Sequence, residues 1–142
     1  MKIHIIDFLK SGEFGGLSAT TTQAEVKDMF GTPDASSQER RGMVIWKFGR
    51  VQLFFLRKRL AQIFVYYSSD SEADKDGSTL FLGDEFAASP TLPAFRAFFD
   101  NVGISWRIKP ELTFESQTCL ELSSGVELIF EGELCSNIGK SL

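Results

Sequence analysis

Histidine and cysteine are scarce in this chain. Its 142 residues include one His and two Cys, which are Cys119 and Cys135. A single imidazole excludes any site that needs two of them, and two thiols form neither a four-thiolate zinc site nor a dense disulfide framework. We therefore expect two ordinary free thiols, no metal site and no cofactor.

Long apolar runs are also missing. The N-terminal run Ile3–Leu9 is interrupted by Asp7, and no segment approaches the length of a membrane span. The run lacks the long apolar core and cleavage site of a signal peptide, and no lipoprotein-type cysteine follows it. We therefore expect a cytoplasmic protein with no membrane partner. The run itself fits either a short helix or a strand over residues 3–8.

The apolar content is sufficient for one folded core. Hydrophobic residues make up 43% of the chain and include 14 Phe. A chain of this length predicts a single domain, residues 1–142. The net charge of −4 argues against a surface built for nucleic acid, so we expect no nucleic-acid partner.

Residues 17–67 predict a helix followed by an antiparallel meander. Thr22 and Glu25 have the spacing of a capping box, and Gly31 followed by Pro33 ends the helix. Three runs of β-forming residues come next, separated by short turns. We expect strands at Met43–Phe48, Val51–Leu56 and Leu60–Tyr67.

Residues 90–142 repeat this order. A helix containing Phe95 and ending at Gly103 precedes several strand candidates, and Val51–Phe55 matches Val126–Phe130 in pattern. A polar loop, residues 68–89, joins the two repeats. The predicted class is α+β, with short helices packed on one face of antiparallel sheet. The strand candidates of the second repeat are Ile104–Ile108, Leu112–Glu115, Thr118–Leu122, Val126–Glu131 and Leu134–Ile138.

The joining loop carries an acidic run, Asp70–Gly77, that partly matches a calcium-binding loop. With Glu72 at the first position, the bidentate Glu at the twelfth would fall on Gly83. Flanking helices are not predicted either. We therefore interpret the run as a solvated loop and expect no calcium site.

The first repeat resembles known bacterial proteins. Residues 14–65 carry the pattern helix, Gly-x-Pro, strand, Phe-Gly, strand, Leu-x-x-Ile, through Gly31-Thr32-Pro33, Phe48-Gly49 and Leu60-Ala61-Gln62-Ile63. This pattern is similar to small bacterial cytoplasmic proteins, to the outer-membrane assembly lipoprotein BamE and its relatives, and to several immunity proteins of toxin systems. The resemblance implies a helix-plus-meander scaffold and no catalytic residue.

No residue pattern in the chain predicts a catalytic site. Ser123-Ser124-Gly125 is typical of a hairpin turn, and the two carboxylates Glu127 and Glu131 are expected on an exposed strand face, where their pKa values are not readily raised. Arg57-Lys58-Arg59 lies near several aromatic residues, a combination that can bind nucleic acid. Three cations in a turn, however, usually only keep the turn solvated. We therefore expect no enzyme.

Charge divides unevenly along the chain. Residues 1–70 hold 10 Lys/Arg and 7 Asp/Glu, whereas residues 71–142 hold 5 and 12. In the predicted C-terminal strands, acids alternate with apolar residues, which would create an acidic face that attracts a basic partner. The alternative is ordinary solubility of an acidic protein. The predicted partner-binding residues are Glu115, Glu121, Glu127, Glu131 and Glu133.

These observations predict a binding protein without catalysis. The specific hypothesis is an immunity protein that neutralises a bacterial toxin, with the basic cleft of a nuclease toxin as the complementary surface. One alternative is a housekeeping or regulatory interaction module, as a monomer or a homodimer through its aromatic strands. Another is a carboxylate-dependent hydrolase.

Overall fold

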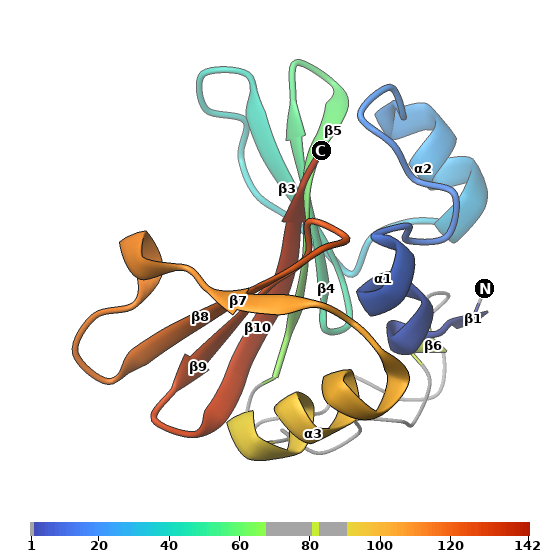
Figure 1. Ribbon diagram of the computed structural model, residues 1–142. Helices are drawn as coiled ribbons and strands as arrows, with labels where there is room; N and C mark the ends of the chain where they lie inside the picture. Colours follow the sequence, from blue (N-terminus) through green and yellow to red (C-terminus); the bar gives the residue numbers. More distant parts are fainter. Residues whose placement is uncertain (1, 68–80, 83–90) are drawn as a thin grey trace.

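The described chain forms three α-helices and one large antiparallel sheet. The computed structural model describes residues 2–67, 81–82 and 91–142. Within them, eight strands pair in the order β2-β3-β4-β5-β10-β9-β8-β7. The helices lie on one side of this sheet (Figure 1). The predicted α+β class is confirmed.

The first unit of the sheet begins with α2 (Gln23–Phe30). The predicted cap at Thr22 is confirmed, since its Oγ1 accepts a hydrogen bond from the Glu25 N–H at 3.2 Å and donates to the Glu25 carboxylate at 3.1 Å. The helix ends at Gly31, whose φ of 79° is readily adopted by glycine. The meander that follows consists of β2 (Ala35–Ser36), β3 (Met43–Phe48), β4 (Val51–Leu56) and β5 (Arg59–Tyr66).

The second unit begins with α3 (Leu92–Val102). Thr91 caps this helix by accepting a hydrogen bond from the Ala94 N–H at 3.2 Å, and Gly103 ends it. A short 3-10 turn separates the first two strands of the unit. The strands are β7 (Trp106–Ile108), β8 (Gln117–Leu122), β9 (Glu127–Glu131) and β10 (Leu134–Ser141), and the turn is η3 (Pro110–Leu112).

The predicted strand Leu112–Glu115 is wrong. Pro110 begins η3, and Glu115 has a φ of 54°, which is the left-handed conformation of a turn rather than a strand. The Thr113 hydroxyl donates a hydrogen bond to the Lys109 carbonyl at 2.9 Å and so holds the turn. The local β-preference of this run is overridden because proline and the side-chain hydrogen bond favour a turn.

The two units are arranged alike around β5 and β10. Each helix starts at a threonine that forms a bridge to the first residue of a central strand: Thr22 to Arg59 and Thr91 to Leu134. β5 and β10 pair antiparallel at the middle of the sheet. From either edge of the sheet to its middle, the four strands of a unit therefore follow one another in chain order. An approximate two-fold axis passes between β5 and β10 (Figure 1).

The N-terminal segment forms a helix rather than the alternative strand over residues 3–8. β1 (Lys2–Ile3) pairs in parallel with β6 (Phe81–Leu82), and α1 is Ile5–Ser11. The rest of the predicted loop 68–89, including the acidic run, lies outside the described residues. None of the described helices is long and apolar enough to cross a bilayer.

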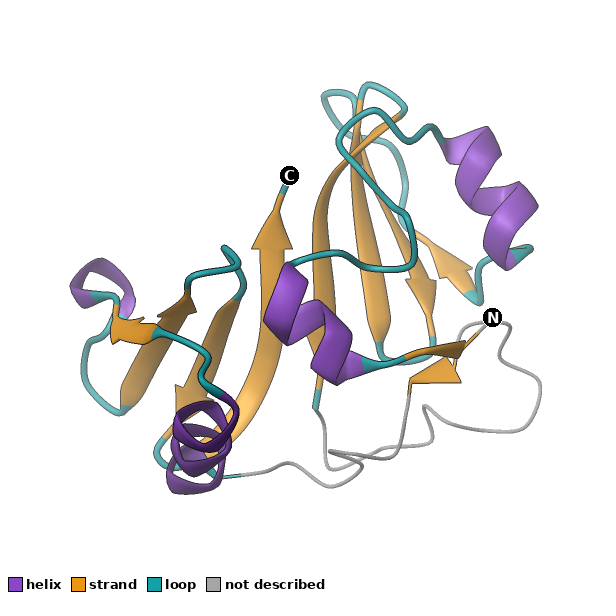
Figure 2. Cartoon of the chain, turned by 45° about the vertical axis from the view of Figure 1, so that its right-hand side comes forward, coloured by secondary structure: helices purple, strands orange, loops and turns teal. Residues whose placement is uncertain are grey.

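The core lies between the sheet and the three helices (Figure 2). Aromatic rings of the helices pack against rings of the sheet. The ring centroids of Phe30 and Phe48 are 6.0 Å apart in the first unit, and those of Phe95 and Phe130 are 5.8 Å apart in the second. The alternation of buried and half-buried residues along β4, β5 and β9 assigns every second side chain to this core. The opposite face, which we call the open face, is covered by none of the described α-helices.

Candidate functional site

The open face of the first unit is apolar and aromatic. Ile45, Phe54, Phe64 and Tyr66 are half-buried there, and the rings of Phe54 and Phe64 meet edge to face with centroids 5.1 Å apart. An antiparallel sheet covered on one side usually carries polar residues on the other. An apolar open face is therefore a candidate for contact with another molecule.

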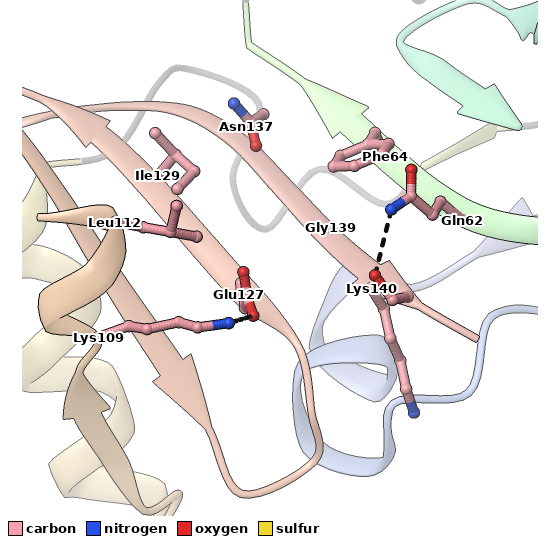
Figure 3. A pocket seen from close by; sticks show the side chains of 10 residues that line it. Gln62, Phe64, Lys109, Leu112, Glu127, Ile129, Asn137, Gly139 and Lys140 are labelled. Atoms are coloured by element: carbon pink, nitrogen blue, oxygen red, sulfur yellow. Dashed lines mark hydrogen bonds and ion pairs between the residues drawn. The ribbon is translucent and has the colours of Figure 1, made fainter. Parts of the chain in front are cut away.

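A hollow of about 410 Å³ lies on the open face where the two units meet (Figure 3). Phe64 forms part of its wall from β5, and Gly139 lies beside that ring on β10. A Cβ at Gly139 would come within 2.5 Å of the Phe64 ring, so glycine is needed there to accommodate it. Amide groups of Gln62 and Asn137 add polar lining, which makes the hollow suitable for a mixed polar and apolar contact.

Two of the predicted acidic residues, Glu121 and Glu127, belong to an ion-pair network. They are register partners on β8 and β9. Arg107 contacts Glu121 at 2.7 Å, while Lys109 lies 3.6 Å from Glu121 and pairs closely with Glu127 (Figure 3). The hydrogen bond that Lys109 donates to Glu127, together with the negative charges of Glu127 and Glu121, raises the pKa of Lys109. This part of the acidic face is therefore neutralised from within the fold.

The other three predicted acids gather at one end of the sheet. Glu115 lies in the turn before β8, and Glu131 and Glu133 lie at the β9–β10 turn. The Gly132 N–H donates to the Ser116 carbonyl at 2.8 Å, which holds the two turns side by side. The set is named the acidic tip, and it comprises Phe114, Glu115, Glu131, Glu133 and Leu134.

The acidic tip combines unpaired charge with exposed apolar surface. None of its three carboxylates forms an ion pair with another described residue. Phe114 and Leu134 are 54% and 56% exposed, although residues of this kind are usually buried. An apolar centre bordered by charge is typical of protein-binding surfaces.

A basic counterpart lies at the equivalent place in the first unit. The Arg57 N–H donates to the Gly42 carbonyl at 2.8 Å, which joins the β4–β5 turn to the turn before β3. The bridge between Arg40 and Met43 corresponds to the bridge between Phe114 and Gln117 in the second unit. The set is named the basic tip, and it comprises Arg40, Arg41, Met43, Leu56, Arg57, Lys58 and Arg59.

The basic tip has the same composition with the opposite charge. Met43 and Leu56 are register partners, and each is 47% exposed. None of the five cations forms an ion pair with another described residue. From the sequence, only the cluster of three cations at residues 57–59 was identified, because the contact of this turn with the 40–42 turn depends on strand pairing. The sequence did not predict the exposed apolar residues of the two tips for the same reason; they are Met43, Leu56, Phe114 and Leu134.

The two cysteines are free and buried, as predicted. Burial raises the pKa of the Cys119 thiol to about 11 and that of Cys135 to about 12. Cys119 pairs with Ile129 and Cys135 with Phe130 on the intervening strand β9, so the thiols point to opposite faces of the sheet. Such thiols are largely protonated at neutral pH and are poor nucleophiles.

Metal-binding groups are absent from residues 2–67, 81–82 and 91–142. No group of three or more His, Cys, Asp or Glu side chains in these ranges could hold a metal ion. Of the acids in the acidic tip, Glu131 accepts a hydrogen bond from the Ser116 hydroxyl at 3.0 Å.

Comparison of the chain with protein-family models, with curated protein sequences and with solved structures finds no match. The resemblance to BamE-like and immunity proteins therefore stays a prediction.

Proposed function

We propose that this chain is a cytoplasmic binding protein that acts without catalysis and that its acidic tip binds a basic surface of a partner protein. The specific form of the proposal is an immunity protein that neutralises a bacterial toxin. The observation that carries it is the acidic tip, where three carboxylates without an ion pair to another described residue border exposed Phe114 and Leu134.

The chemistry of the acidic tip suits a basic partner. Carboxylates on exposed turns steer a cationic surface toward the tip, and the two apolar side chains lose their contact with water when the partner docks. A nuclease toxin must attract a polyanionic substrate, so its active-site cleft is basic. An acidic tip placed in such a cleft would compete with the substrate for the same charges.

The alternative of a hydrolase is less well supported. Of its predicted carboxylate pair, Glu127 is already engaged by Lys109, and Glu131 accepts a hydrogen bond from the Ser116 hydroxyl at 3.0 Å. A general acid usually has an environment that keeps it protonated, whereas cations next to a carboxylate favour its charged form. A regulatory interaction module would use the same tips with a different partner, and only the identity of that partner separates it from an immunity protein.

The binding test uses the toxin-like protein encoded beside this gene. A triple variant, E115Q/E131Q/E133Q, removes the charge of the acidic tip and keeps its shape. We expect binding at least ten-fold weaker by calorimetry, or about 1.4 kcal/mol. The matched control, D7N/E13Q/D28N, removes the same charge from exposed residues outside the acidic tip and should bind as the wild type does.

Two results would contradict the proposal. The wild-type protein could fail to bind the toxin-like protein, or the triple variant and its control could bind equally well. The first result would remove the immunity function, and the second would remove the acidic tip from the interface.

A further inference from the structure

The two tips are complementary to each other. The acidic tip and the basic tip occupy equivalent positions in the two units, and each has two exposed apolar side chains within a charged border. One border is anionic and the other is cationic, with no ion pair to another described residue in either. Each tip therefore carries the charge that complements the charge of the other. Within one molecule the two tips lie at opposite ends of the sheet (Figure 1).

We infer that the basic tip of one molecule docks on the acidic tip of a second copy, in a closed two-fold dimer that brings the two open faces together. This inference stands on the tips and the open face alone and does not depend on the toxin partner. A two-fold axis makes both contacts at once, because each copy offers one tip of each charge.

The backbone conformation of the two tips also supports a role for their charged residues. Four non-glycine residues in the described chain have positive φ: Arg41 (53°), Arg57 (51°), Lys58 (68°) and Glu115 (54°). All four are in the tips. Left-handed turn positions usually hold Gly, Asn or Asp, because other side chains are strained there. Charged side chains kept at strained positions are typical of residues with a role outside the fold.

The position of the exposed apolar side chains favours a face-to-face arrangement. Met43 and Leu56 lie on the same side of the sheet as Ile45 and Phe54, which is the open face. Leu134 pairs with Glu131, which follows Ile129 in the alternation of β9 and so also lies on the open side. Both tips therefore present apolar surface in the same direction.

The centre of the proposed interface is the seam between β5 and β10. Phe64 and Ile129 line the hollow there, close to the approximate two-fold axis of the chain. In the closed dimer Phe64 and Ile129 are covered together with the polar groups that line the hollow, while charged pairs form at both ends. That arrangement matches the apolar core and polar rim of a specific interface.

Charge exchange between the tips gives the most selective test. One variant, R57E/K58E/R59E, makes both tips acidic, and the other, E131K/E133K, makes both tips basic. The mass of each protein is measured by sedimentation at about 0.05 M and about 0.5 M salt, where charges in solvent are weakly and strongly screened. Circular dichroism and thermal melting show whether each variant is folded.

We expect the wild-type protein to sediment as a dimer at low salt, with an apparent Kd at least ten-fold weaker at high salt. Each variant alone should sediment as a monomer, because like charges then meet at both contacts. An equimolar mixture of the two variants should regain the dimer mass. Recovery by mixing also shows that neither variant failed because it was misfolded.

Several outcomes would overturn the inference. These are a monomeric wild-type protein at both salt concentrations, variants that dimerise as the wild type does, a mixture that stays monomeric, or wild-type assemblies that grow beyond a dimer. Single-stranded RNA that binds the monomeric wild-type protein but not R57E/K58E/R59E would assign the basic tip to nucleic acid instead. Failure of toxin binding would leave the mixing result unaffected, so the two proposals fail separately.

Discussion

Lys58 occupies a backbone conformation that glycine adopts at lower cost. Its φ of 68° follows the φ of 51° at Arg57, as in a two-residue turn with both central residues left-handed. We expect Lys58→Gly to raise the free energy of unfolding by about 0.5–1 kcal/mol, because it relieves steric strain. Urea denaturation at high salt, where the tips are screened, measures this gain.

Lys58→Ala is the matched control for this substitution. It removes the same charge but keeps the Cβ atom that is strained at positive φ. The alanine variant should therefore show no comparable gain. Equal stabilisation by alanine and glycine would mean that charge repulsion within the basic tip, rather than backbone strain, limits stability.

Helix α1 is held in place at its C-terminal end by the second unit. Ser124 Oγ donates to the Leu9 carbonyl at 2.8 Å, and Lys140 Nζ donates to the Gly12 carbonyl at 3.1 Å. A cation near a helix C-terminus also stabilises the helix dipole. These contacts join segments more than 100 residues apart, so α1 and the second unit should unfold together.

Gly12→Ala tests this attachment. Gly12 has a φ of 75°, and a Cβ there would lie 2.5 Å from the Ser124 carbonyl oxygen, which belongs to the backbone and moves with difficulty. We expect a loss of about 2 kcal/mol or more in the free energy of unfolding. Gly16→Ala is the control: its φ is 81° but nothing lies within 4 Å, so only the strain of about 1 kcal/mol remains. Equal losses in both variants would mean that the contact with Ser124 is unimportant.

Elements with local signals could be predicted from the sequence. The Thr22 cap, the Gly31 end of α2 and most strands after residue 43 follow from nearby residues. The two-residue strands β1 and β2 could not be predicted, because their pairing depends on distant segments. The 3-10 turn at Pro110 was missed because strand propensity was weighed above the proline.

The candidate site was predicted in part. Acids were expected on the outer face of the C-terminal strands, but the charges that neutralise Glu121 and Glu127 come from Arg107 and Lys109 across the sheet. That pairing depends on the register of β7 and β8 and on the path of η3, which periodicity does not specify. The meeting of two separate turns in each tip is likewise a property of the folded sheet.

At the scale of the whole molecule, the division of charge is the central feature. The first unit, residues 22–66, holds 8 Lys/Arg and 4 Asp/Glu, whereas residues 91–141 hold 4 and 7. The fold places these opposite excesses at equivalent turns on opposite ends of one sheet. A molecule built in this way has two docking surfaces of opposite sign, joined by an open face that is apolar over the first unit.

Amide NMR spectra recorded during dilution at low salt test this central claim most directly, because they report every part of the surface at once. We predict that peak positions change with concentration for residues 40–43 and 56–59 of the basic tip and 114–117 and 131–134 of the acidic tip, with smaller changes beside Phe64. The amide peaks of residues on the outer surfaces of α2 and α3 should not shift. Changes confined to those helices, or spectra that do not depend on concentration, would contradict the account.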